Sequence, residues 1–338
     1  MRAKLGVSYF GVRNPEHVAR DLDRMTAAGC NVVLHTFSEN DLRFYPGTMR
    51  EIVSLSKERG FEVYLDPWGV GGVFGGEAFT QFALEHDSAR QVLSDGTKAP
   101  AACPNQPEFR DFMRQWVEEA VRIGADVIFL DEPHFWDPRV LGDAGGPWGC
   151  RCERCQGGYR TRYGEPMPRE LTPEVRGFQE ESLVSFLGQL ASVAHRSGAK
   201  VALCLLPDWQ DPEGVVQRWE KFAALEDVDI FGTDPYWMWA GRPFSVYEFF
   251  TRAVAELAGK YGKEPQIWIQ ACKVPQGREA EVRRAVETAW RFGIRNIMAW
   301  SFLGTPYMTR VRSDRPEVVW KELGAAYLAI RKGEEQGG

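Results

Sequence analysis

Eight short apolar runs alternate with amphipathic stretches along this chain, and that alternation limits the folds open to it. Each run is continuously apolar, which is typical of parallel strands buried on both faces. The runs are residues 5–10, 31–37, 62–68, 126–135, 200–207, 228–237, 266–273 and 296–302. We therefore expect eight strands that form one parallel sheet.

A helical stretch separates each run from the next, and several of these stretches end in a glycine that can take the left-handed conformation at a helix end. They are residues 15–28, 48–59, 108–123, 174–197, 212–225, 246–261, 279–292 and 316–331. Eight strand–helix units predict an α/β fold, the (β/α)8 TIM barrel, as a single domain over residues 1–338. A doubly wound open sheet is the alternative, but such sheets seldom contain eight regular units.

Two connections are much longer than the others, residues 69–107 and 136–171. Both follow strands, so both are predicted to lie on the C-terminal face, where barrel enzymes carry out their chemistry. The second is a loop excursion that carries three of the seven cysteines, and with them a predicted metal site.

Charge and hydropathy exclude several classes of protein. The net charge is -6 and no basic stripe is present, so nucleic acid is not an expected partner. No signal peptide precedes the first run and no apolar stretch is long enough to span a bilayer, so we expect a cytoplasmic protein without a membrane partner. The sequence leaves open whether copies of the chain associate into a homo-oligomer.

Cys150, Cys152 and Cys155 form a C-x-C-x-x-C motif, and Cys103 is a fourth, distant thiol. This spacing is typical of a tetrahedral zinc site, and four thiolates leave no position open for chemistry, so the zinc would be structural. A set of free thiols is the alternative, although exposed clustered thiols oxidise easily.

Asp131 and Glu132 close the fourth apolar run. Adjacent residues on a strand point to opposite sides, so only one would face the lumen unless the strand ends in a twist at Pro133. A carboxyl among aromatic rings is poorly solvated, which raises its pKa and suits it to act as a general acid on a glycosidic oxygen. We assign that role to Glu132 and an orienting role to Asp131; a structural pair that bonds loop amides is the alternative.

Flat aromatic and polar side chains gather at the other predicted strand ends. Sugar C–H faces stack on aromatic rings, and sugar hydroxyls bond to carboxylates and amides, so the expected ligand is a carbohydrate. If the tryptophans only cap the barrel core, this inference fails. The candidate substrate-binding residues are His35, Asp66, Trp68, His134, Trp209, Tyr236, Trp237, Gln270, Lys273 and Trp300.

Residues 103–164 resemble the glycoside hydrolase family 42 β-galactosidases and their clan A relatives. The likeness rests on Cys-Pro-Asn-Gln-Pro-Glu-Phe from residue 103, the acid-Glu strand end, the cysteine triplet and Tyr163-Gly164. The strand at 297–302 is similar to the last strand of the clan, whose tryptophan lines the sugar pocket. The resemblance implies that the four thiols bind zinc and that Glu132 is the acid/base.

Two residues depart from the clan A pattern. Asp131 stands where these enzymes carry asparagine, and Gln270 stands where they carry the nucleophilic glutamate at the end of the seventh strand. An amide cannot form the glycosyl–enzyme intermediate. Asp234 is therefore expected to be the second catalytic carboxylate, with Asp66 as the next choice.

The adjacent Asp131-Glu132 also resembles the pair in substrate-assisted N-acetylhexosaminidases, where the 2-acetamido group of the substrate is the nucleophile, the aspartate orients it and the glutamate is the acid. A third hypothesis is a catalytically inactive sugar-binding barrel, which Gln270 keeps open. The identity of the sugar, the linkage and the anomeric outcome do not follow from the sequence.

Overall fold

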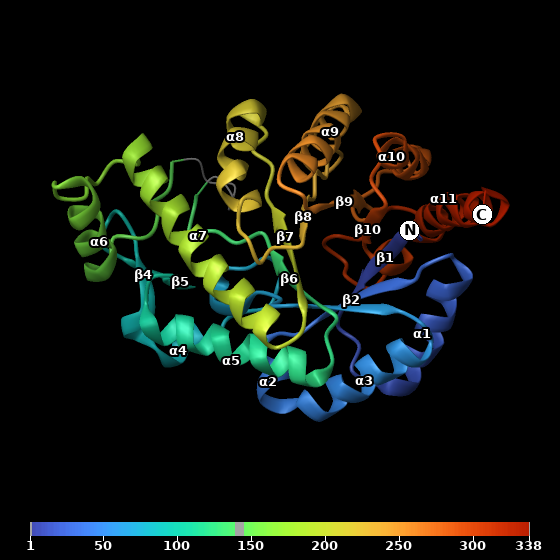
Figure 1. Ribbon diagram of the computed structural model, residues 1–338, viewed down its shortest axis with the longest axis horizontal. Coiled ribbons are helices and arrows are strands. Elements are labelled where there is room, and N and C mark those ends of the chain that lie inside the picture. Colours follow the sequence, from blue (N-terminus) through green and yellow to red (C-terminus); the bar gives the residue numbers. More distant parts are fainter. Residues whose placement is uncertain (1, 139–144, 338) are drawn as a thin grey trace.

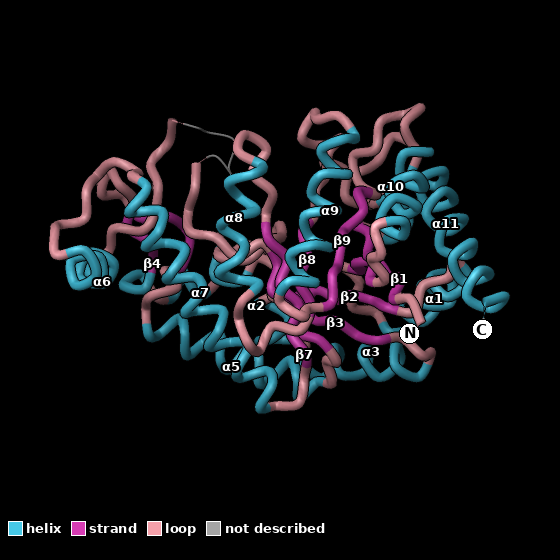
Figure 2. Tube along the Cα trace, turned by 45° about the horizontal axis from the view of Figure 1, so that its top comes forward, coloured by secondary structure: helices cyan, strands magenta, loops and turns pink. Residues whose placement is uncertain are grey.

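A computed structural model describes residues 2–138 and 145–337, and its strands close into a barrel (Figures 1 and 2). All eight barrel strands are parallel, and the ring order is β1-β10-β9-β8-β7-β6-β3-β2. The predicted (β/α)8 barrel is thus confirmed. The barrel strands are β1 Lys4–Tyr9, β2 Val32–Thr36, β3 Glu62–Asp66, β6 Val127–Asp131, β7 Lys200–Leu205, β8 Ile230–Thr233, β9 Glu264–Gln270 and β10 Asn296–Trp300.

Helices cover the outside of the ring, and their ends follow local sequence signals. Proline at the first helical turn begins many of them, since its missing N–H is not needed there. The principal helices are α1 Pro15–Ala27, α3 Pro46–Glu58, α5 Pro107–Ile123, α7 Pro173–Arg196, α8 Pro212–Ala223, α9 Phe244–Lys260, α10 Ala280–Arg291 and α11 Pro316–Gly337, and short helices are α2 Glu39–Phe44, α4 Phe82–Glu85 and α6 Glu153–Tyr163.

Side chains fill the lumen of the barrel in layers. Tyr64, Phe129 and Trp268 lie fully or almost fully buried inside the ring, with the Phe129 and Trp268 ring centroids 5.1 Å apart. Since side chains alternate along a strand, the residues two positions later at the C-terminal ends also face inward. That parity directs Asp66 and Asp131 into the lumen.

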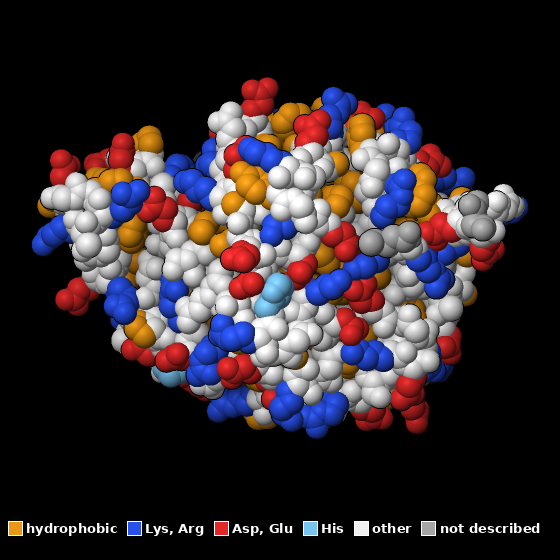
Figure 3. Space-filling view, viewed as in Figure 1, with side chains coloured by type: hydrophobic (Ala, Val, Ile, Leu, Met, Phe, Trp, Pro, Cys, Tyr) orange, Lys and Arg blue, Asp and Glu red, His pale blue; other side chains and the backbone are white. Residues whose placement is uncertain are grey.

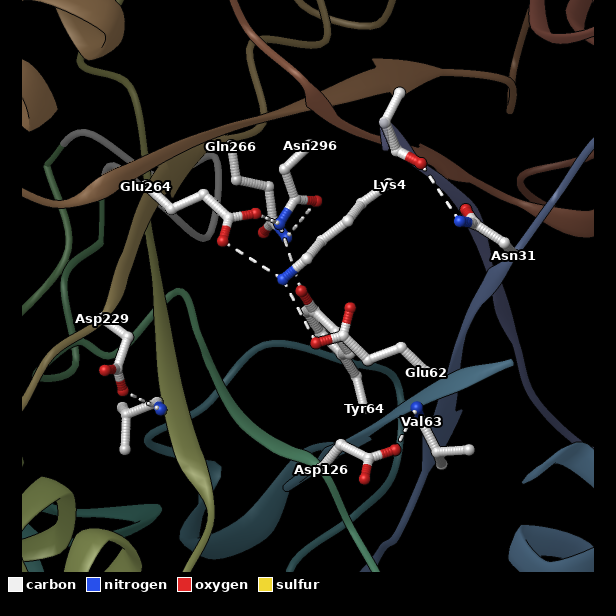
Figure 4. A network of polar contacts seen from close by, with 12 residues as sticks. Lys4, Asn31, Glu62, Val63, Tyr64, Asp126, Asp229, Glu264, Gln266 and Asn296 are labelled. Carbon is white, nitrogen blue, oxygen red and sulfur yellow. Dashed lines mark hydrogen bonds and ion pairs between the residues drawn. The ribbon is translucent and has the colours of Figure 1, made fainter. Parts of the chain in front are cut away.

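The N-terminal end of the barrel is filled by a polar network (Figure 4). The Lys4 ammonium lies 3.1 Å from a carboxylate oxygen of Glu62 and 3.1 Å from one of Glu264. The Asn296 amide donates to the Tyr64 hydroxyl and to Glu264. Because charges and hydrogen bonds are matched at this end, we interpret the network as structural. Active sites of such barrels lie at the opposite, C-terminal face.

The connection after β3 holds an antiparallel hairpin that we did not predict from sequence. Its strands are β4 Arg90–Val92 and β5 Lys98–Ala102, and Asp95-Gly96 lies in the turn between them. Asp-Gly between short strands is a common hairpin signal. In the other long connection, the predicted excursion 136–171 contains α6, while its residues 139–144 fall outside the described part of the chain.

Acidic and basic side chains are interspersed over the face seen in Figure 3. Helix α11 lies beside the start of the chain, where Arg331 donates to the Ala3 carbonyl.

Among residues 2–138 and 145–337, no helix combines the length and the apolar character needed to cross a membrane.

Candidate active site

The acid pair lies at the C-terminal end of β6. Asp131 is the last residue of the strand, and Glu132 leaves it with a φ of 43° and donates its N–H to the Cys204 carbonyl at 2.9 Å. A non-glycine residue at positive φ is strained, and such residues gather at functional sites. This turn ends the alternation of side chains along the strand and brings both carboxyl groups to one side. The sequence predicted this arrangement only if the strand ended in a twist at Pro133.

Gly75, in the connection after β3, packs directly against both carboxyl groups. A Cβ atom placed on Gly75 would lie 2.7 Å from Asp131 Oδ2 and 2.9 Å from Glu132 Oε2. The Gly75 N–H donates to the Asp131 carbonyl at 3.0 Å, so the backbone of this loop is held against the strand end. Only glycine permits so close an approach.

Asp234 follows β8 and reaches the same cluster. Its carboxyl group hydrogen-bonds to that of Glu132. Two carboxyl groups in contact share a proton, since like charges cannot both ionise there. Glycosidases that act with two carboxylates hold a sugar between groups about 5–5.5 Å or about 6.5–9.5 Å apart. The expected role of Asp234 as the opposing carboxylate therefore does not fit this contact.

Burial is the main electrostatic influence on the cluster. It raises the pKa of Asp66, Asp131 and Asp234 well above the usual value, and the Glu132 charge raises each pKa further. One oxygen of Asp66 and one of Asp234 are buried without a hydrogen-bond partner among the described residues. The cluster therefore retains protons at neutral pH.

Aromatic rings form one wall of the site. The Trp300 centroid lies 6.3 Å from Trp68 and from Tyr236, 6.1 Å from Trp239 and 5.7 Å from Phe10. Tyr236 and Trp300 are nearly parallel, at 21°. Such a wall can hold the apolar faces of sugar rings.

Trp237, expected in this wall, lies elsewhere. It is fully buried, packs edge-on against Phe244 and donates its indole N–H to Glu281. Trp239, two residues later and 42% exposed, takes the place predicted for Trp237. The chain forms a turn after β8, so strand alternation does not extend to these residues.

A cavity of about 890 Å³ joins the acids to the aromatic wall and continues beyond them. Its volume is in the range of small-molecule sites, about 300–1,000 Å³. The expected residues that line it are Trp68, Asp131, Glu132, His134, Trp209, Asp234, Tyr236 and Trp300. Other lining residues were not predicted from the sequence, among them Glu77, Trp136, Trp148, Arg176, Arg218, Trp239 and Arg242.

His35, proposed from sequence as a sugar ligand, does not line the cavity. His35 points outward from β2, with Nε2 2.9 Å from the Ser56 hydroxyl, and burial lowers its pKa to about 3. This direction follows from strand alternation, because its neighbour Leu34 faces the lumen. His35 is therefore a packed, neutral histidine rather than a sugar ligand.

Gln270 has a structural part in the site. Its Oε1 accepts the N–H groups of Met238 and Trp239 at 2.9 and 3.2 Å, and its Nε2 donates to the Cys272 carbonyl at 2.9 Å. A glutamate could not make the last bond. The amide therefore holds the turn that presents Trp239, and it is too fully bonded and buried to contact a substrate.

Three further residues predicted from the sequence differ in where they lie. Asp66 is buried close to Glu132 and does not line the cavity. Lys273 lies with its ammonium 3.9 Å from the Trp239 ring centroid, a cation–π contact at the rim. His134 Nδ1 is 2.6 Å from the Glu132 carbonyl oxygen, which can only accept, so Nδ1 carries the proton.

The four cysteines expected to bind metal converge and are buried. All four sulfur atoms lie within 4.8 Å of one another, with Cys103 Sγ 3.5 Å from Cys155 Sγ and 3.8 Å from Cys152 Sγ. Sulfurs at the corners of a zinc tetrahedron with bonds of about 2.3 Å stand about 3.8 Å apart. A disulfide needs about 2.05 Å. The cluster can hold a metal ion.

Donors surround these sulfurs, as outer groups commonly do at metal sites. The Cys152 N–H points to Cys150 Sγ, and Asn105 donates from its backbone to Cys103 and from its amide to Cys155. Trp148 precedes the motif by two residues and lines the cavity. The cluster thus ties the β4–β5 hairpin to the segment that forms one cavity wall.

Replacing Gly75 by alanine should reduce activity by at least about tenfold and stability by about 1–3 kcal/mol, because the new methyl group would overlap both carboxyl groups. Steady-state kinetics and thermal unfolding measure the two effects. Gly259→Ala is the control, since nothing lies within 4 Å of its added Cβ. Wild-type kcat in the Gly75 variant would show that the carboxyl positions are unimportant.

No family model matches the chain, and no curated protein sequence does. Solved structures do resemble it. The endo-1,4-beta-mannanase of Rhizomucor miehei has a TM-score of 0.65 at 10% identity, covering 98% of this chain and 95% of that one. The PgaB (BpsB) glycoside hydrolase domain of Bordetella bronchiseptica has a TM-score of 0.60 at 13% identity, covering 92% and 97%.

The same fold also occurs with another activity. The D-psicose 3-epimerase of Clostridium cellulolyticum has a TM-score of 0.53 at 13% identity, covering 97% of this chain and 98% of that one. At such identities the likeness shows a shared barrel fold, and a resemblance to family 42 in particular is not among these findings.

Proposed function

We propose that this protein is a glycoside hydrolase that cleaves O-glycosidic bonds of a carbohydrate, with Glu132 as the general acid/base. The observation that carries the proposal is one cavity lined both by Glu132 and Asp131 and by the aromatic wall that includes Trp68, Tyr236 and Trp300. Several glycoside hydrolases are also among the proteins with this fold.

The acid step follows from the surroundings of Glu132. The Asp234 carboxyl, whose pKa burial raises well above its usual value, hydrogen-bonds to the carboxyl of Glu132. A proton held there can pass to the glycosidic oxygen as the bond to the anomeric carbon breaks. The aromatic wall would keep the sugar ring in place during this transfer.

Hydrolysis of chromogenic aryl glycosides tests the proposal. A panel that contains matched sugars with a 2-hydroxyl and a 2-acetamido group should include at least one substrate whose turnover depends on Glu132. Tight binding of oligosaccharides without any turnover would instead support the inactive sugar-binding barrel.

A second candidate is the substrate-assisted N-acetylhexosaminidase, favoured by the positions of Asp131 Oδ2 and Glu132 Oε2 side by side against Gly75. In that mechanism Asp131 orients the 2-acetamido group, which attacks the anomeric carbon while Glu132 protonates the leaving group. Cleavage of 2-acetamido sugars alone, with a large loss of kcat in Asp131→Asn, would favour this candidate. Comparable cleavage of 2-hydroxyl sugars would reject it.

We further propose that the metal of the cysteine cluster is zinc, bound by Cys103, Cys150, Cys152 and Cys155. Tetrahedral four-thiolate sites suit zinc, and with four protein ligands such an ion is structural. Zinc would then stabilise the wall that contains Trp148 and take no part in the reaction.

A further inference from the structure

The two-carboxylate mechanism lacks one group in this site. Glu132 can supply the acid, but the catalysis also needs a carboxylate across the sugar from it. Gln270 is an amide committed to backbone bonds, and Asp234 is in contact with Glu132. Asp66 is buried and does not line the cavity.

Glu77 lines the same cavity as Glu132 and comes from the connection after β3. It follows Gly75 by two residues, so its Cα lies within about 7 Å of the glycine that contacts both acids. The loop is well anchored: Gly69 donates to the Gly75 carbonyl at 2.7 Å, and Gly76, at a φ of 113°, packs against the Trp68 indole.

Glu77 interacts electrostatically with residues that follow β9. The pKa of the Cys272 thiol, two residues beyond β9, is raised by burial and next by the Glu77 charge. Lys273 in turn lowers the pKa of Glu77. The charge of Glu77 therefore acts on the residues that follow the seventh barrel strand, the strand whose last residue, Gln270, is an amide and not a carboxylate.

The protonation of Glu77 suits a base. The Glu77 side chain is exposed to solvent and lines the cavity. Burial, with the Glu132 charge as a smaller cause, raises the pKa of Glu77 to about 7. A general base works best when its pKa is close to the working pH.

We propose that Glu77 is the second catalytic carboxylate, the general base that activates water against the anomeric carbon. The Glu77 carboxylate takes one proton from water while the water oxygen bonds to that carbon. The bond to the leaving oxygen breaks, its electron pair stays on that oxygen, and Glu132 protonates it. The products are a free sugar of inverted configuration and an alcohol.

This inference rests on the proposed glycosidase activity and deepens it. The test compares wild-type protein with Glu77→Gln and with the control Glu85→Gln, which changes an exposed glutamate of the same connection that pairs with Arg43. Glu77→Gln should lower kcat about 10²–10⁴-fold, as loss of a general base does, while oligosaccharide affinity by calorimetry stays within about threefold. Glu85→Gln should match the wild type.

Two further measurements separate a base from a merely structural residue. The wild-type kcat/KM should rise with pH through an apparent pKa near 7 as Glu77 ionises, and this limb should vanish in Glu77→Gln. Azide should restore turnover in Glu77→Ala by attacking the anomeric carbon in place of activated water, and NMR of the wild-type reaction should show inversion.

The failures are distinguishable. If the wild type hydrolyses a glycoside and Glu77→Gln keeps its kcat, or the anomeric configuration is retained, the role of Glu77 is refuted while the glycosidase remains. If the wild type hydrolyses no glycoside in the panel, the proposed function and the role of Glu77 both fail.

Discussion

Replacing Glu132 by glutamine is expected to lower kcat on a natural glycoside by about 10²–10⁴-fold, because the leaving group then departs without a proton. Aryl glycosides with acidic phenol leaving groups need little protonation, so their kcat should fall much less. A plot of log kcat against leaving-group pKa should therefore become steeper in the variant.

The same substitution provides its own control for folding. Glutamine has the shape of glutamate, and its amide can donate to the Asp234 carboxyl that Glu132 now contacts. The Tm should thus be unchanged or raised. Full activity of Glu132→Gln on a natural glycoside would mean that Asp131 and Glu132 are a structural pair.

Removal of the metal should have the largest effect on stability. Metal analysis of untreated protein should find one zinc per chain, and X-ray absorption should give Zn–S distances of about 2.3 Å. Structural zinc sites in small peptides contribute about 10–16 kcal/mol of apparent binding free energy at pH 7, so chelation should lower the Tm markedly. The loss of stability should precede any change in the chemical step.

A matched pair of variants isolates the cluster. Cys155→Ser should lose zinc and unfold at a lower temperature, whereas Cys30→Ala removes a buried thiol outside the cluster and should keep its zinc. A disulfide among the four clustered cysteines, or protein free of zinc at wild-type stability, would contradict the assignment.

The barrel was predictable because parallel strands that are buried on both faces give a simple pattern in the sequence. Each run is apolar over its whole length, and glycines mark the helix ends that precede the next run. The hairpin of β4 and β5 lacks such a pattern, since its strands are three and five residues long and contain charged and small residues. Only Asp95-Gly96 pointed to it.

The site was predictable where strand ends position side chains, and less so beyond them. Trp68 and Trp300 lie where the strand ends indicated. Trp239 lines the cavity where Trp237 was expected, because a turn separates both residues from β8. Glu77 gave no signal, since its position depends on how the connection after β3 folds back over the acids. Gln270 could be identified as an amide, but its three backbone partners appear only in the structure.

The barrel of this chain cannot close until its last strand has been synthesised. Strand β1 pairs with β10, so one edge of the first strand stays unpaired until the last barrel strand has been made. The Tyr327 hydroxyl on α11 then lies across that junction, 3.0 Å from the carbonyl oxygens of Gly6 and of Ile297, and its one proton can be donated to either. A nascent or truncated chain that stops before β10 exposes apolar strand edges, which invite pairing with other chains. Truncation of the chain before residue 296, which removes β10, should therefore increase chaperone dependence and inclusion-body formation far more than substitutions in the outer helices do.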